Sequence, residues 1–245
     1  MANPTAAMLV IGDEILSGRT QDANTHHLAQ ELTKAGIDLR EVRVVPDVQS
    51  EIVDAVNALR RKYTHVFTSG GIGPTHDDIT ADSIAAAFGV PIGVRAVARD
   101  LLASNYAGGT ADLTEARLRM ARIPEGAKLI VNAISKAPGF SMENVHVMAG
   151  VPAIFVVMLE SLLPDLTHGQ PVLSRTIRLD VPESQVAETL ADIAQAFPDL
   201  SIGSYPFSMY GKYGTNIVVR GTDKALVDDA AMAVNMAFDE AVNVD

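Results

Sequence analysis

The stretch SGGIGPTHDDIT, residues 69–80, decides the fold because it joins a buried strand to a helix. Residues 65–69, HVFTS, are expected to form a short buried strand, and residues 79–88 form an Ala-rich helical pattern that ends at Gly89. A glycine-rich loop between such elements lies where an α/β sheet presents ligands at its carboxyl edge. We therefore predict a ligand site in this loop.

Two earlier segments repeat the same order of strand, loop and helix. Successive units of this kind predict a mostly parallel sheet that is covered by helices on both faces. The strands expected in this α/β domain cover residues 6–11, 39–45, 65–69, 128–131 and 145–148, and the helices cover residues 24–34, 51–63, 79–88, 95–106, 114–122 and 153–163.

Residues 164–171 have the composition of a linker. After them, the order of the expected strands and helices changes. We predict a main domain over residues 1–166 and a small α+β lobe over residues 172–245. Met232 and Met236, at helical spacing, are most simply core residues of the lobe. The strands expected in the lobe cover residues 176–179, 201–205 and 216–220, and the helices cover residues 183–197 and 224–241.

The composition limits the class of function. A formal net charge of -11 repels phosphate backbones, so we expect no nucleic-acid partner, and a polyphosphate ligand would need backbone amides or a cation. The absence of cysteine excludes disulfides and thiolate chemistry and fits a cytoplasmic protein. The start of the chain lacks the pattern of an export signal, and Gly150, Pro152 and Glu160 interrupt the most apolar later segment, so we expect no membrane association.

The glycine loop has the features of a phosphate site. Its glycines let the backbone approach a ligand closely, and the following helix adds the positive end of its dipole. The loop matches neither a P-loop nor a dinucleotide fingerprint, and the alternative is a plain turn in which Asp78 or Thr80 caps the helix. The residues predicted to contact a phosphorylated small molecule here are Ser69, Gly70, Gly71, Gly73, Pro74, Thr75 and Thr80.

Acidic residues follow each of the first three strands. Because parallel strands place their carboxyl ends at one edge, these loops can converge, and a hard divalent cation such as Mg²⁺, Mn²⁺ or Co²⁺ needs convergent carboxylates. A carboxylate with a raised pKa could also act as a base toward water. The alternative is a set of solvated loop acids, with Asn24 or Thr25 capping a helix. The predicted metal ligands are Glu14, Asp47, Asp77 and Asp78, and Gly12, Asp13, Asp22 and Asn24 are predicted to line the same pocket.

Five motifs occur in order along the chain: GDEILSG (12–18), DAN (22–24), VPD (45–47), GGIGPT with DDIT (70–80) and AGVP (149–152). Together they resemble the MoaB/Mog molybdopterin-binding family. Within that family the chain is similar to the CinA amino-terminal domain and to the molybdopterin-binding-like domain of eukaryotic FAD synthase. The resemblance implies a three-layer α/β/α domain that self-associates as a dimer or trimer.

The resemblance also implies roles for particular residues. Asp47 and Asp78 match the family positions that matter for catalysis and metal handling, and Asn132, Pro138 and Gly139 match part of the ligand pocket. The implied activity is metal-dependent cleavage of a nucleotide diphosphate such as FAD or ADP-ribose, and the alternative is binding or transfer of molybdopterin without hydrolysis. Ser135 and Ala149 depart from the family pattern. We expect neither amidase nor adenylyltransferase activity, because residues 1–245 do not include the amidase domain of full CinA or the adenylyltransferase domain of FAD synthase.

Overall fold

The computed structural model describes residues 3–209, 211–238 and 241–244. It divides the chain into two compact units, unit 1 (Met1–Gly169) and unit 2 (Gln170–Asp245). No helix among the described residues is long and apolar enough to span a membrane.

Unit 1 is built on a mixed sheet with the strand order β2-β1-β3-β8-β7-β6. Neighbouring strands from β2 to β8 pair in parallel, and β7 pairs antiparallel with both β8 and β6. A separate two-stranded ribbon joins β4 to β5. The strands of unit 1 are β1 (Thr5–Ile11), β2 (Asp38–Val45), β3 (His65–Ser69), β4 (Ile92–Val94), β5 (Arg122–Pro124), β6 (Lys128–Ile130), β7 (Gly139–Met142) and β8 (Val145–Met148).

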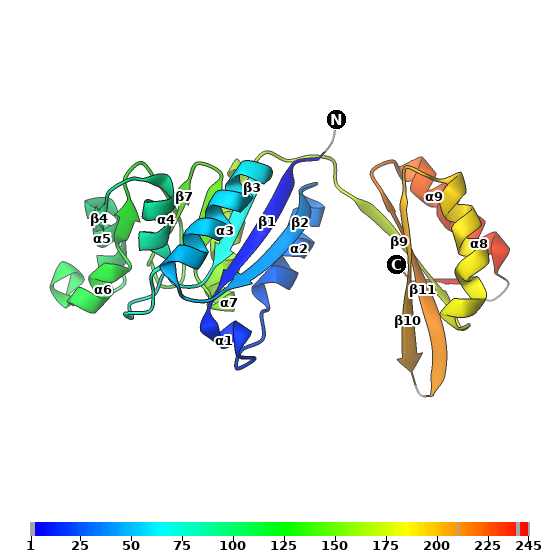
Figure 1. Cartoon of the computed structure of the whole chain (residues 1–245), viewed down its shortest axis with the longest axis horizontal. Helices are drawn as coiled ribbons and strands as arrows, with labels where there is room; N and C mark the ends of the chain where they lie inside the picture. The colour runs from blue at the N-terminus through cyan, green and yellow to red at the C-terminus, as the bar shows by residue number, and fades with distance from the viewer. Residues whose placement is uncertain (1–2, 210, 239–240, 245) are drawn as a thin grey trace. The chain divides into compact units, whose positions relative to one another are not determined.

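Helices cover both faces of this sheet (Figure 1). Alternate residues of β1 point to opposite faces, as the pleat of a strand requires, so Leu9 packs in the layer with α3 and α4 while Met8 packs in the layer with α2 and α7. The helices of unit 1 are α1 (Asp13–Leu16), α2 (Asn24–Lys34), α3 (Gln49–Lys62), α4 (Thr80–Phe88), α5 (Ala96–Ala103), α6 (Glu115–Arg119) and α7 (Pro152–Leu162), with short 3-10 turns at η1 (Gly109–Asp112) and η2 (Leu163–Asp165).

This architecture confirms the predicted three-layer α/β/α fold with a mostly parallel sheet. Three strands, β4, β5 and β7, were not predicted, because each is only three or four residues long and lacks a clear apolar alternation. The helix expected over residues 114–122 is wrong at its end, since α6 stops at Arg119 and the chain continues into β5.

Unit 2 has the order strand, helix, strand, strand, helix, strand. Its antiparallel sheet has the order β10-β11-β9-β12, and the apolar sides of α8 and α9 pack on one face of it. This is the split βαβ arrangement, and it confirms the predicted α+β lobe. The elements of unit 2 are β9 (Leu173–Leu179), α8 (Glu183–Ala196), β10 (Ser201–Met209), β11 (Lys212–Gly221), α9 (Lys224–Ala237) and β12 (Val242–Asn243).

Two predictions for unit 2 are wrong. The final helix ends at Ala237, before the expected residue 241, because Phe238 has an extended backbone. Met232 and Met236 are exposed and do not belong to the core, which α9 supplies instead from the residues on its opposite side, including Val227 and Val234. Helical spacing identifies residues that share a side of a helix, but it does not say which side faces the sheet.

The edge strand β2 is fastened to the end of α3 by one carboxylate. Glu41 Oε2 accepts hydrogen bonds from the Tyr63 hydroxyl at 2.6 Å and from Lys62 Nζ at 2.9 Å, and Glu41 Oε1 accepts one from Arg43 Nε at 2.6 Å. These donors, the Tyr63 hydroxyl first, lower the pKa of Glu41 from 4.5 to about 2. The ionised carboxylate therefore stabilises the folded state.

We predict that Glu41→Gln lowers the free energy of unfolding by about 1–2 kcal/mol at pH 7, between the values typical of exposed ion pairs and of hydrogen bonds to a charged group. Because the folded-state pKa of Glu41 is depressed, its contribution is complete above the ordinary pKa and is lost as the pH falls from 4.5 toward 2. Urea unfolding followed by circular dichroism at several pH values measures this, with the exposed Glu160→Gln as control. A difference between wild type and variant that does not shrink below pH 4 would contradict the assignment.

Candidate functional site

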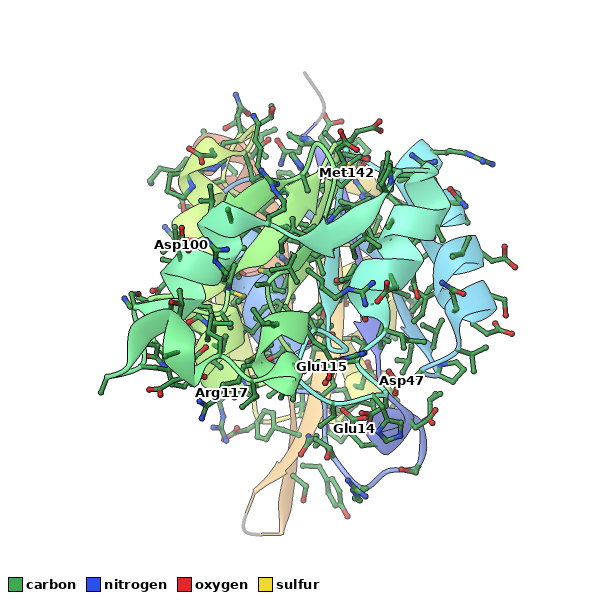
Figure 2. All side chains as sticks on the ribbon, turned by 90° about the vertical axis from the view of Figure 1, so that its left-hand side faces the viewer. Glu14, Asp47, Asp100, Glu115, Arg117 and Met142 are labelled. Carbon is green, nitrogen blue, oxygen red and sulfur yellow. The ribbon has the colours of Figure 1, made fainter. Side chains whose placement is uncertain are left out.

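The loops after β1 and β2 meet at the carboxyl edge of the sheet. The backbone N–H of Asp13 donates a 3.0 Å hydrogen bond to Asp47 Oδ2, and the backbone N–H of Gly12 donates one to the Val45 carbonyl. A Cβ placed on Gly12 would lie 2.5 Å from Glu14 Oε2, so the Glu14 carboxylate lies directly over the Gly12 backbone. Figure 2 shows Glu14 and Asp47 at this same end of unit 1.

Asp47 is a half-buried carboxylate with acidic neighbours. Its partial burial raises the pKa, the hydrogen bond from Asp13 opposes that rise, and the negative charges of Asp13, Glu14 and Asp77 add to it. These three neighbours come from the loop after β1 and the loop after β3. The structure therefore brings the first three loops together around Asp47.

Asn24, at the start of α2, links the surrounding loops through hydrogen bonds. Its side-chain amide donates to Ser69 Oγ at 2.7 Å and to the Gly150 carbonyl at 2.8 Å. Asn24 and Ser69 are buried, and both line a cavity of about 60 Å³ between the first loop and the glycine loop. The α2 amides of Asn24 and Thr25 are capped by Asp22 Oδ1, so the predicted capping residue shifts from Asn24 or Thr25 to Asp22.

The glycine loop passes close over the end of β1. Gly70 has φ +110, and a Cβ at this position would collide with the Ile11 carbonyl oxygen. Gly71 has φ +65, and a Cβ there would collide with the side chain of the fully buried Thr80, whose hydroxyl donates to the Gly70 carbonyl at 3.0 Å. Both positions therefore require glycine, for sterics as well as for backbone conformation.

Three consecutive backbone N–H groups in this loop are available to a ligand. Within the described chain, no acceptor receives a hydrogen bond from the backbone N–H of Gly71, Ile72 or Gly73. Positive φ angles at Gly70 and Gly71 are typical of backbone concavities that bind anions through successive amides. This arrangement suits a phosphate group. The same loop carries Asp77, whose charge acts on Asp47, so the amides lie near the acidic cluster.

Asp78 organises the end of the loop. Its Oδ2 accepts hydrogen bonds from the Thr75 backbone N–H at 2.7 Å and from the Thr75 hydroxyl at 2.6 Å. Neither Asp78 nor Thr80 makes a side-chain cap on α4, so the predicted alternative of a helix cap is wrong. The Thr75 hydroxyl also lies close enough to Asp77 to lower its pKa, and the charge of Arg119 contributes to the same shift. Pro74 and Thr75 are exposed.

The predicted residues after β6 are buried and serve the fold directly. Asn132 Oδ1 accepts from the backbone N–H groups of Ile134 and Ser135, and its amide donates to the Ala137 carbonyl, so this side chain shapes the following turn. Pro138 lines a cavity of about 10 Å³ next to Gly73 and Asp78. Gly139 starts β7, where a Cβ would collide with the Val147 carbonyl. Their contact with a ligand stays a prediction.

Two arginines that the sequence did not single out lie beside the loop. Arg119 Nη2 donates to the Asp78 carbonyl at 3.1 Å, and Arg122 forms an ion pair with Asp82 at 2.5 Å. Both line the same 10 Å³ cavity as Gly73 and Pro138. They are separated from the glycine loop by about 40 residues of sequence. No local motif marks them, so only the fold of the intervening lobe could reveal them.

The described residues contain no group of three or more His, Asp or Glu side chains arranged to hold a metal ion. A Mg²⁺ ion is typically bound by one or two carboxylates together with ligand phosphates, so a complete protein cage is not required. Glu14 and Asp47, with their mutual repulsion, fit such a partial set. Metal binding by Glu14, Asp47, Asp77 and Asp78 stays a prediction.

A larger groove lies elsewhere on unit 1. It has a volume of about 740 Å³ and is lined by residues at the amino ends of β3 and β8, including His65 and His146. His146 Nδ1 lies 2.9 Å from Ser141 Oγ, and burial lowers the pKa of His146 to about 3, so this ring is neutral. Because the glycine loop lies at the carboxyl ends of the same strands, this groove is separate from the candidate site.

Comparison with known proteins gives two family matches that cover most of the chain. Residues 7–168 match the family described as "Probable molybdopterin binding domain", and residues 171–245 match the "FAD synthase, middle domain". The two matches meet beside the boundary between units 1 and 2. They confirm the resemblance predicted from the sequence motifs.

Individual relatives agree with these matches. The chain is similar to the crystal structure of the protein CinA with unknown function from Thermoplasma acidophilum, with 32% identity and a TM-score of 0.62 over 67% of this chain and 99% of that chain. A protein of Archaeoglobus fulgidus is 30% identical over 236 residues, which cover 96% of this chain and 97% of the relative. A probable FAD synthase of Caenorhabditis elegans is 36% identical over 227 residues, covering 82% of this chain and 44% of that protein.

The close approach at Gly70 gives a direct test of the site geometry. We predict that Gly70→Ala lowers the free energy of unfolding by more than about 3 kcal/mol, since a collision with the Ile11 carbonyl adds to the cost of about 1–2 kcal/mol for a left-handed backbone. Gly18→Ala is the matched control, because Gly18 has φ +73 with no atom within 4 Å of the added Cβ, and only the backbone cost applies. Equal losses for the two variants in urea unfolding would contradict the close approach.

Proposed function

This chain belongs to the family of probable molybdopterin binding domains, and we propose that it is a metal-dependent pyrophosphatase that cleaves a nucleotide diphosphate cofactor such as FAD or ADP-ribose. The observation that carries the proposal is the row of unpaired amides at Gly71, Ile72 and Gly73 beside the carboxylates around Asp47. Amides and carboxylates in one place suit a phosphate that arrives together with a cation.

The loop amides hold one phosphate group of the substrate. Their N–H groups need no reorganisation to accept it, because the glycine backbone, the buried Thr80 and the Asp78–Thr75 hydrogen bonds already fix the loop. Fixed donors of this kind stabilise negative charge that grows on phosphate oxygens during the reaction. The glycine loop is therefore the part of the site that stabilises the transition state.

The carboxylates of Glu14 and Asp47, with Asp77 nearby, would hold the divalent cation that accompanies the phosphate. Mg²⁺, Mn²⁺ or Co²⁺, when bound, supplies Lewis-acid polarisation of a phosphoryl oxygen. The raised pKa of Asp47 belongs to the site without a cation, and a bound cation would lower it. The Asp47 carboxylate oxygen that does not touch the cation would accept the proton of the attacking water. Asp78 keeps the loop in place through Thr75 and contributes negative charge at its edge.

The alternative is binding or transfer of molybdopterin or its adenylate without hydrolysis. The name of the matched family favours this reading of the ligand, and the same amides would hold the molybdopterin phosphate. In that case Asp47 would position a cation and the attacking water would be absent. The two proposals share the site and differ only in whether a phosphate linkage is broken.

Self-association also remains a proposal. We expect a homo-oligomer, a dimer or a trimer, in the cytoplasm. Met232 and Met236 on α9 are 59% and 80% exposed in the single chain. A contact between two copies of the chain would bury these apolar side chains.

The decisive assay incubates the purified chain with FAD or ADP-ribose and Mg²⁺, Mn²⁺ or Co²⁺ and follows AMP by chromatography. We expect AMP to form only when a cation is present. Binding of the same compounds without AMP under all three cations would reject hydrolysis and favour the molybdopterin alternative.

The acids in the site are tested in the same assay. Asp47→Asn should lower turnover by about 10²–10⁴-fold, the range for loss of a general base, whereas Asp54→Asn, an exposed position on α3, should have no effect. Asp78→Asn keeps an acceptor for both Thr75 donors, so the thermal midpoint should hold while turnover falls severely from loss of charge. Unchanged turnover in Asp78→Asn would assign Asp78 to the turn alone.

A further inference from the structure

Arg119 is an arginine without a carboxylate partner at the edge of the glycine loop. It is the last residue of α6, in the lobe formed by α5, η1 and α6, and its Nη2 donates to the Asp78 carbonyl at 3.1 Å. No carboxylate among the described residues lies within ion-pair distance of Arg119, whereas its neighbour Arg122 is paired with Asp82. Arg119 therefore carries a positive charge that no ion pair neutralises.

The surroundings of Arg119 face the ligand site. Arg119 lines the 10 Å³ cavity together with Gly73 and Asp78, and this cavity has the size of about one oxygen-sized probe. The Nε atoms of Arg119 and Arg122 are buried and make no hydrogen bond in the described structure. Two buried guanidinium donors without acceptors beside a row of unpaired amides are suited to an anion's oxygen atoms.

The charge balance of the site supports the same conclusion. A diphosphate brings more negative charge than three neutral amides can compensate, and the chain as a whole carries a net charge of -11. Asp47, Glu14 and Asp77 add to the repulsion unless a cation covers them. A guanidinium group presents planar paired donors that match phosphate oxygens, and Arg119 has donors left over after its bond to Asp78.

We propose that Arg119 binds the second phosphate of the ligand, next to the phosphate held by the amides of Gly71 to Gly73, and so makes the site selective for diphosphates over monophosphates. The inference rests on the proposed site for a phosphorylated nucleotide and adds its specificity determinant. Arg119 acts as a ligand-binding residue, and its bond to the Asp78 carbonyl orients it before the ligand arrives.

The test compares two nucleotides that differ by one phosphate. Isothermal titration at excess Mg²⁺ uses α,β-methylene-ADP, whose bridge cannot be hydrolysed, and AMP. Wild type should bind α,β-methylene-ADP more tightly than AMP. Arg119→Gln should weaken α,β-methylene-ADP binding by about 10-fold to 100-fold, the loss expected for hydrogen bonds to a charged group, and change AMP binding by less than about 2-fold. Arg119→Lys should recover part of the loss.

Arg99→Gln is the matched control. Arg99 is on α5 of the same lobe and is paired with the adjacent Asp100, which lies away from Glu14 and Asp47 (Figure 2). This variant should leave both affinities unchanged. Equal weakening of both nucleotides in Arg119→Gln would overturn the proposal, because it would assign Arg119 to the loop alone, and unchanged binding of both, or no binding of either by wild type, would overturn it as well.

The outcome separates this inference from the proposed hydrolysis. If the diphosphate preference depends on Arg119 but the protein forms no AMP from FAD or ADP-ribose, the pyrophosphatase proposal is rejected and the role of Arg119 is supported. If wild type and Arg119→Gln form AMP with the same KM, the pyrophosphatase proposal is supported and the role of Arg119 is rejected.

Discussion

The close approach of the Gly70 backbone to the Ile11 carbonyl is the constraint on which the site depends. Because Gly70 has no side chain, the loop after β3 can cross the end of β1, where Asn24 joins it through Ser69 and Gly150. The turn that results leaves the next three amides without partners in the described structure and fixes them from behind through Thr80. A larger residue at this position would push the loop away from the acids of the first loop, and amides and carboxylates would no longer act on one ligand.

The second constraint on the site is an excess of negative charge around Asp47. Partial burial and the charges of the nearby carboxylates raise the pKa of Asp47, so its ionised form is held in the site at an electrostatic cost. Such a cost is typical of places where a cation or a proton transfer is needed. Arg119, supplied by a lobe inserted between β4 and β5, places one positive charge at the Asp78 end of the glycine loop. The proposed ligand, a diphosphate with a divalent cation, matches this order of charges.

Sequence alone predicts the parts of this molecule that depend on local patterns. The apolar run of residues 6–11 identifies β1, and the repeated order of strand, loop and helix identifies β2 and β3. The rule that parallel strands end at one edge brings Asp47 near the glycine loop. Long-range features escape it: β7 is a four-residue antiparallel strand, Arg119 reaches the loop from about 40 residues away, and Met236 faces away from the core despite its helical spacing. These depend on tertiary packing, which no short window of residues contains. The hydrogen bonds that Asp22 accepts from the Asn24 backbone and that Asn132 donates to the Ala137 carbonyl likewise could not be predicted from the sequence.

A crystal structure of the chain with Mn²⁺ and α,β-methylene-ADP tests the central claim most directly, because Mn²⁺ is located by its anomalous signal. We expect a phosphate oxygen within hydrogen-bond distance of the Gly71, Ile72 and Gly73 amides and a Mn²⁺ ion coordinated by a carboxylate oxygen of Asp47 or Glu14. A nucleotide bound elsewhere, such as in the groove beside His65 and His146, with the glycine loop amides facing only solvent, would contradict it.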